Sequence, residues 1–135
     1  MIKQSILDTD ILSEFLRGHH KVIAKVDEHL KEFGFINLSI ITYYEILNGL
    51  LFKDAGKQLI KFEEFVELNK VIPLTLTMAK TAALIQAELR KKGAEIGHTD
   101  TLIAGIAITS ELQLVTNNTK HFKRIKGLEI DNWTK

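Results

Sequence analysis

The sequence contains no cysteine, and this absence excludes several classes of protein. A chain without cysteine has no disulfide framework and no thiolate to serve as a nucleophile or as a soft metal ligand. The five histidines show none of the spacings that zinc sites use, so we expect no soft-metal centre. Metal chemistry in this chain would depend on oxygen ligands, which suit hard cations such as Mg²⁺.

Long apolar runs are also missing, and proline is almost absent. No apolar stretch approaches the ~18 residues of a membrane span, and residues 1–5 show no basic stretch followed by a long apolar region. Pro73 is the single proline, and no low-complexity linker or internal repeat interrupts the 135 residues. We therefore expect one soluble, cytoplasmic domain over residues 1–135, without a signal peptide and with no association with a membrane.

The formal net charge is only +1, so the overall composition does not indicate a nucleic-acid-binding protein. The basic residues are nevertheless grouped. Such clusters are usually solvated surface, but they also suit contact with phosphates. The two clusters are residues 90–92 and the segment that contains Lys120, Lys123, Arg124 and Lys126.

Strand-like and helix-like segments alternate along the chain. Short apolar runs predict strands at residues 5–7, 35–39, 71–74, 112–115 and 128–130. Helical spacing of apolar residues predicts helices at residues 11–16, 22–33, 43–52, 59–68, 77–92 and 98–108. This alternation predicts an α/β fold with a central, mostly parallel sheet of four to five strands and helices on both faces.

Residues 6–12 give the first indication of a functional site. Asp8 follows the first predicted strand, and Thr9 and Asp10, both good N-cap residues, precede the first predicted helix. In open α/β sheets, ligands bind at the carboxyl ends of the strands. Taken alone, however, the stretch is equally consistent with a simple helix cap.

Three further polar residues are predicted to lie at the same edge as Asp8. Glu45 is about one turn into the helix after the second strand, and Asp100 is in the first turn of the helix at residues 98–108. Asn118 follows the fourth strand. Singly, a first-turn acid is favoured by the helix dipole and an asparagine is common in turns. These local explanations do not account for the joint placement of all four.

Grouped carboxylates suit metal-assisted cleavage of a phosphodiester. Mg²⁺ takes octahedral oxygen ligands and keeps several waters, so a few carboxylates and a substrate phosphate suffice to hold it. Two such ions can stabilise both the attacking and the leaving oxygen. Without a cation, crowded carboxylates repel one another, and the pKa of one of them rises.

These segments resemble the motifs of a known family. Residues 6–12, 39–49 and 98–105 resemble the three acidic motifs of PIN-domain ribonucleases. Residues 114–122 and 127–133 resemble the tail of the VapC toxins, the toxin halves of bacterial toxin–antitoxin pairs. No single motif is specific, but four occur in order at the expected element ends, and the resemblance covers essentially the whole chain.

The resemblance implies an endoribonuclease that depends on Mg²⁺, with Mn²⁺ as a substitute. Asp8 and Asp100 would be metal ligands, and Glu45 would complete the catalytic cluster directly or through a water. Thr9 and Asp10 would support the loop that aims Asp8 at the metal. A metal-activated water would attack the phosphodiester in line.

The resemblance also implies partners. VapC toxins pair with a VapB antitoxin, whose C-terminal segment covers the active-site groove, and they usually form homodimers. Residues 116–118 and the tail with Trp133 look most like the VapC members that cut initiator tRNA in the anticodon loop, so tRNA is the expected substrate. Five apolar residues are either core or part of a dimer or antitoxin interface: Tyr43, Tyr44, Leu47, Leu50 and Leu51.

One position departs from the family pattern. Many relatives carry an acid immediately before Phe122, where this chain has His121. The role of a fourth acid then falls to Asn118 or Thr116 through a water, or His121 contacts the RNA backbone instead. The sequence therefore predicts a one-metal site, or a second ion that arrives only with the RNA phosphate.

Other functions remain open from the sequence. In an aspartate-nucleophile phosphatase Asp8 would be the nucleophile and Asp10 the general acid, although the chain lacks the later pair of acids. A receiver domain needs a phosphoaccepting aspartate after a central strand, and Asp54 is the only candidate. A catalytically weakened PIN-like domain would bind RNA or a partner without cutting. His98, beside the Asp100 turn, is a further candidate for contact with substrate.

Overall fold

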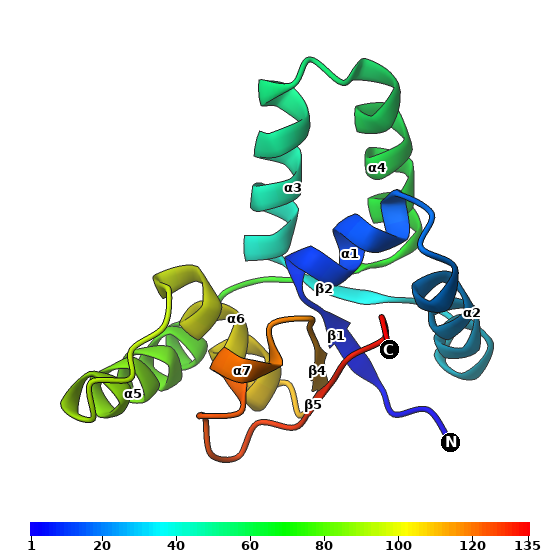
Figure 1. Cartoon of the computed structure of the whole chain (residues 1–135). Helices are drawn as coiled ribbons and strands as arrows, with labels where there is room; N and C mark the ends of the chain where they lie inside the picture. Colours follow the sequence, from blue (N-terminus) through cyan, green and yellow to red (C-terminus); the bar gives the residue numbers. More distant parts are fainter.

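A computed structural model describes residues 1–135, and its centre is a five-stranded sheet (Figure 1). The strands are β1 (Ser5–Leu7), β2 (Asn37–Ser39), β3 (Lys70–Ile72), β4 (Gln113–Val115) and β5 (Ile130–Asp131). Every pairing is parallel, and the spatial order is β3-β2-β1-β4-β5. The predicted α/β class is confirmed, and the sheet is wholly rather than mostly parallel.

Helices cover both faces of this sheet, as the sequence predicts. They are α1 (Thr9–Leu16), α2 (His20–Phe33), α3 (Ile40–Phe52), α4 (Gly56–Leu68), α5 (Leu76–Lys91), α6 (His98–Thr109) and α7 (Thr119–Phe122). Successive strand residues point to opposite faces, and the core divides accordingly. Ile6 and Leu114 pack with α5, α6 and α7, whereas Leu7 and Val115 pack with α1 to α4. None of the helices combines the length and apolar character that a membrane crossing requires.

The order of the strands reverses at β1, which lies between β2 and β4 (Figure 1). The chain runs outward from β1 to β2 and β3, and then returns to place β4 and β5 on the other side of β1. In open parallel sheets a ligand crevice forms at the carboxyl ends of the strands beside such a reversal. The carboxyl ends of β1 and β4 are therefore the expected place for a site.

Side-chain caps start two helices earlier than the sequence pattern indicates. The Ser39 Oγ accepts a hydrogen bond from the Thr42 N–H at 3.0 Å, so α3 begins at Ile40, directly after β2. Thr75 caps α5 in the same way, so the prediction that Thr77 caps this helix is wrong by two residues. The early start of α3 brings its first two turns against the end of the sheet.

His29 is a buried residue of α2 that holds the start of β1. Its Nε2 accepts a hydrogen bond from the Ser5 N–H at 3.0 Å, and its Nδ1 donates to the Phe35 carbonyl at 2.9 Å. Burial lowers the pKa of His29, which agrees with a neutral ring that accepts at one nitrogen and donates at the other. His29 is therefore a structural histidine, remote from the acidic edge.

Replacement of Gly105 by alanine is expected to destabilise the fold. Gly105 lies where α6 packs on α5, and an added Cβ would be 2.6 Å from the Met78 carbonyl oxygen and 3.1 Å from the Ala82 Cβ. Overpacking of this kind costs about 1–3 kcal/mol. Gly49→Ala is the matched control, because a Cβ there meets nothing within 4 Å and alanine favours a helix by about 0.5–1 kcal/mol. Urea unfolding of both variants tests this packing, and equal stabilities would contradict it.

Candidate active site

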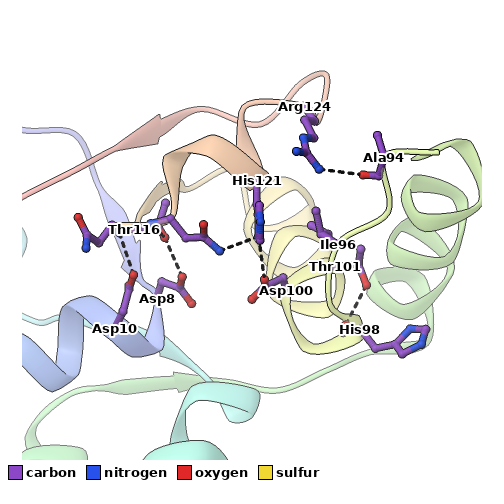
Figure 2. A network of polar contacts seen from close by, with 12 residues as sticks. Asp8, Asp10, Ala94, Ile96, His98, Asp100, Thr101, Thr116, His121 and Arg124 are labelled. Atoms are coloured by element: carbon purple, nitrogen blue, oxygen red, sulfur yellow. Dashed lines mark hydrogen bonds and ion pairs between the residues drawn. The ribbon is translucent and has the colours of Figure 1, made fainter. Parts of the chain in front are cut away.

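Asp8 lies at the carboxyl end of β1 and is also the N-cap residue of α1. Its side chain is buried, with 5% of the residue exposed. Oδ1 accepts a hydrogen bond from the Thr9 N–H at 2.8 Å, and Oδ2 accepts one from the Thr116 hydroxyl at 2.8 Å (Figure 2). Asp8 therefore caps α1 and also lies at the acidic edge. The sequence left open whether Asp8 is a helix cap or a site residue, and the structure allows both roles.

The pairing of β1 with β4 brings Thr116 beside Asp8. Leu7 pairs with Val115, and the Asp8 N–H donates to the Val115 carbonyl at 2.9 Å. Asp8 and Thr116, the residues that follow β1 and β4, therefore lie side by side at the edge of the sheet. The Thr116 hydroxyl oxygen also accepts from the Asn118 N–H at 2.9 Å, which fixes the turn that leads into α7.

Asp10, in the first turn of α1, is tied to the same turn. Its Oδ2 accepts a hydrogen bond from the Asn117 N–H at 3.0 Å (Figure 2). The Asn117 side-chain oxygen in turn accepts from the Asn132 amide at 2.9 Å, so the C-terminal tail braces the turn. The other carboxylate oxygen of Asp10 is buried without any hydrogen-bond partner. A buried anionic oxygen of this kind is costly unless a cation or a proton satisfies it.

Glu45 reaches the same edge from α3. Its Oε1 accepts a hydrogen bond from the Thr9 hydroxyl at 2.6 Å. The Thr9 and Thr42 hydroxyl oxygens are 3.0 Å apart, and because the Thr9 proton goes to Glu45, the Thr42 hydroxyl donates to Thr9. The Thr9 hydroxyl of α1, itself held by Thr42 of α3, thus orients the Glu45 carboxylate, whose charge raises the pKa of Asp100.

Asp100 enters from the first turn of α6 and faces His121 on α7. The Asp100 Oδ2 is 4.0 Å from the His121 Nδ1 (Figure 2). The same imidazole nitrogen is 2.9 Å from the Asn118 side-chain nitrogen. Four elements therefore bring the residues predicted from the sequence to one edge of the sheet: Asp8 after β1, Glu45 on α3, Asp100 on α6, and Asn118 and His121 at α7.

The pKa of Asp8 reflects this crowding. The pKa of Asp8 is raised from 3.8 to about 7, chiefly by burial and then by the negative charges of Asp10 and, more weakly, Asp100. The hydrogen bonds from Thr116 and Thr9 oppose this rise. A carboxyl that is half-protonated near neutral pH is a perturbed group of the kind found at functional sites.

Asp10 and Asp100 show the same effect in weaker form. Burial raises the pKa of Asp10, the Asn117 N–H opposes the rise, and the charge of Asp100 adds to it. Burial also raises the pKa of Asp100, where His121 acts in the opposite direction and the charge of Glu45 raises it again. The carboxylates are therefore close enough to repel one another.

The donor chemistry of this edge fits a hard divalent cation. The carboxylates supply only oxygen, they repel one another, and one buried oxygen of Asp10 has no partner. No group of three or more acidic or histidine side chains, however, is arranged around one point so that it could hold a metal ion. The three-carboxylate ligand set of Asp8, Glu45 and Asp100 therefore stays a prediction.

The structure also separates some sequence candidates from the site. The His98 ring points away from Asp100 (Figure 2) and is exposed, so it is not part of the acidic edge. Asp54 lies in the turn between α3 and α4 and follows no strand, which makes the receiver-domain interpretation wrong. Thr42 and Asn132 were missed. For Thr42 a signal existed, because it lies three residues before Glu45 and hence on the same helix face.

A hollow of about 400 Å³ opens from the site between α1, α3 and α4. Thr9 and Glu45 line it at the acidic edge. The lining also includes three basic side chains: Arg17, Lys53 and Lys61. The five residues predicted to be either core or interface fall into two groups. Tyr44 and Leu51 are exposed, at 65% and 56%. Tyr43, Leu47 and Leu50 pack against the core.

A wholly parallel sheet with acids gathered where the strand order reverses defines an α/β protein with an acidic edge. Residues 5–128 match the PIN domain family. A ribonuclease VapC1 of Rickettsia felis is 36% identical over 129 residues, which cover 93% of this chain and 92% of that protein. The tRNA(fMet)-specific endonuclease VapC of Salmonella typhimurium is 34% identical over 112 residues, 78% of this chain and 85% of the relative.

A solved structure agrees with these relatives. The crystal structure of DNA-bound VapBC from Salmonella typhimurium has a chain that matches with a TM-score of 0.88 and 28% identity, over 98% of this chain and 99% of that one. The chain therefore belongs to the PIN-domain family and, within it, to the VapC ribonucleases.

Proposed function

We propose that this chain is the toxin of a toxin–antitoxin pair, an endoribonuclease that hydrolyses RNA phosphodiesters with the help of a divalent cation. The observation that carries the proposal is the crowding of Asp8, Asp10, Asp100 and Glu45 at one edge of the sheet. The VapC relatives support the same activity.

In this proposal Asp8, Asp100 and Glu45 hold Mg²⁺, or Mn²⁺ in its place. A bound cation would supply positive charge to the scissile phosphate and lower the pKa of an attacking water. Thr116 and the Thr9 N–H fix the Asp8 carboxylate through its two hydrogen bonds, so both of its oxygens are already oriented. The Thr9 hydroxyl does the same for Glu45, and Asp10 holds the turn at Asn117.

The RNA backbone is proposed to lie along the basic surface beside α7. The two basic clusters of the sequence meet in the fold, because Lys92, Arg124 and Lys126 line one hollow. Arg124 also donates to the Ala94 carbonyl at 3.2 Å, which ties the segment after α7 to the loop that follows α5 (Figure 2). Cations so placed attract the phosphates on either side of a cleavage site. Because one relative is a tRNA(fMet)-specific endonuclease, initiator tRNA is the proposed substrate.

A VapB-like antitoxin is the proposed partner, and the hollow between α1, α3 and α4 is its proposed contact. That hollow reaches Glu45 at one end, so a segment lying in it would block the site. Exposed apolar side chains beside it, including Phe52 at 87% exposure, suit burial by a partner. A VapBC complex is among the structural neighbours. A homodimer is proposed by analogy with VapC toxins.

The test is cleavage by the purified chain after any co-purified partner has been removed. We expect it to cut initiator tRNA in Mg²⁺, to stop when EDTA is added, and to leave single-stranded DNA of the same sequence intact. Co-expression with a small neighbouring gene should yield a complex in which cleavage is suppressed. Undiminished cleavage in EDTA, or equal cleavage of the DNA, would contradict the proposal.

A further inference from the structure

The residues that follow β5 contact the turn between β4 and α7. The Asn132 side-chain nitrogen donates a hydrogen bond to the Asn117 side-chain oxygen at 2.9 Å. Trp133, the next residue, is 1% exposed and belongs to the same core cluster as Leu7 and Val115. This buried indole anchors the tail, so the polar side chain before it faces Asn117 in a defined position.

The orientation of the Asn132 amide is fixed by Thr134. The Asn132 Oδ1 accepts a hydrogen bond from the Thr134 N–H at 2.9 Å and another from the Thr134 hydroxyl at 2.7 Å. Because the oxygen is held by these two donors, the NH₂ group is the end of the amide that reaches Asn117. The contact therefore has a definite donor and a definite acceptor.

The turn passes this contact to the acidic edge at two points. The Asn117 N–H makes the one hydrogen bond that the Asp10 carboxylate accepts from another residue, at 3.0 Å (Figure 2). The adjacent Thr116 hydroxyl donates to the Asp8 Oδ2 at 2.8 Å. Asp8 and Asp10 thus each have one carboxylate oxygen held by this turn.

The backbone of the sheet holds only the first residue of the turn. The Thr116 N–H donates to the Asp131 carbonyl of β5 at 2.9 Å, whereas Asn117 lies beyond the strand and takes part in no hydrogen bond between backbone groups. The side chain of Asn132 therefore supplies the connection between Asn117 and the anchored tail.

We propose that Asn132 is a positioning residue for RNA cleavage, which acts through Asn117 on the carboxylates of Asp8 and Asp10. The inference rests on the proposed function, because it concerns the reaction at that same edge. The bond between the two asparagines is exposed, so it contributes little to the stability of the fold. Misplacement of a reacting group by about 1 Å, in contrast, can lower a rate by about 10²-fold.

Amide hydrogen exchange of the full chain tests the link without RNA. We expect the Asn117 N–H to exchange about tenfold faster in Asn132→Ala than in the wild-type chain, because the turn opens locally more often. The Thr116 N–H, bonded to the Asp131 carbonyl, should keep its protection, which would show that β5 stays in place. Lys135→Gln is the matched control, because it replaces an exposed residue of the same tail and should leave both amides unchanged.

Steady-state cleavage of RNA tests the positioning role. In Asn132→Ala we expect kcat to fall by about tenfold, with KM and the midpoint of thermal unfolding unchanged. Asn117→Ala removes the acceptor of the same bond and keeps the backbone N–H that Asp10 needs. If one hydrogen bond carries the effect, the double variant should be no slower than the slower single variant.

The outcomes separate this inference from the proposed function. An Asn117 N–H that exchanges equally in Asn132→Ala and the wild-type chain would overturn the inference and leave the proposed ribonuclease standing. Losses of kcat that multiply in the double variant, or a lower thermal midpoint without a change in kcat, would also overturn the positioning role. A folded wild-type chain that cuts no RNA would overturn the proposed function, and the positioning role with it.

Discussion

Asp8→Asn is expected to reduce RNA cleavage by about 10³-fold, the usual cost of losing one preorganised electrostatic contact to a reacting group. Asparagine keeps the shape of Asp8 and can still accept from the Thr9 N–H, so the start of α1 should be preserved. What is lost is the negative charge at the buried end of β1. Single-turnover cleavage of initiator tRNA by equal amounts of folded protein measures this loss.

The same substitution should stabilise the fold at alkaline pH. The pKa of Asp8 is about 7 in the folded chain, against 3.8 for an ordinary aspartate. Below pH 3.8 both states are protonated. Between pH 3.8 and about pH 7 the unfolded state has released the proton of Asp8 while the folded state still holds it. The folded state therefore becomes progressively less stable as the pH rises through this range. With about 1.36 kcal/mol for each pKa unit, the full loss is on the order of 4 kcal/mol above pH 7.

Urea unfolding at pH 5 and pH 8.5 without divalent ions checks this sign. The wild-type chain should be less stable at pH 8.5, and Asp8→Asn should remove most of that difference. Asp27→Asn replaces an exposed aspartate on α2. It should show the same change of stability with pH and the same cleavage activity as the wild-type chain. An Asp8→Asn protein that is folded and cuts RNA at the wild-type rate would remove Asp8 from the site.

Asp100→Asn is expected to lower cleavage by a similar factor of about 10³, with a smaller effect on stability. The substitution relieves the repulsion between Asp100 and Glu45 but also removes the favourable charge of Asp100 beside His121. Because Asp100 contributes to the raised pKa of Asp8, that pKa should fall in the variant. The midpoint of the pH-dependent stability should therefore move to a lower pH.

Asp27→Asn is again the matched control. Asp27 is an exposed acid on α2 that lies neither at the acidic edge nor in the basic hollow lined by Lys92 and Arg124. It should behave as the wild-type chain in both assays. If Asp100→Asn cut RNA as fast as Asp27→Asn, the assignment of Asp100 to the site would be wrong.

The fold was predictable because its evidence is local and periodic. Short apolar runs mark the strands, helical spacing marks the helices, and their alternation leaves a parallel sheet as the main solution. The boundaries were harder, because they depend on single caps. Ser39 and Thr75 each accept a hydrogen bond from the N–H three residues ahead. Several neighbouring polar residues are equally suitable N-caps, so the sequence alone does not identify the residue that caps the helix.

The short helix α7 was not predicted, for a different reason. Four residues cannot show a helical period, and an isolated turn of helix is not stable by itself. It forms here because Phe122 is buried in the core and Asn118 starts the turn. The contact of His121 with Asp100 is a consequence of that tertiary packing.

The grouping of the acids was predictable, but the hydrogen bonds that hold them were not. Asp8, Glu45 and Asp100 each follow a strand end or lie in the first turns of a helix, and topology alone brings such positions together. The bond from Asn132 to Asn117 joins residues 15 apart across a tail and a turn. No local pattern encodes such a contact, so it required the three-dimensional structure.

The central claim is that Asp8 and Asp100 hold the cation on which RNA cleavage depends. The most direct measurement is a calorimetric titration of Mn²⁺ into the wild-type chain, Asp8→Asn, Asp100→Asn and the control Asp27→Asn, without RNA. We predict that the wild-type and control proteins bind the ion and that each aspartate variant binds it at least about tenfold more weakly. Equal binding by all four proteins would contradict the claim.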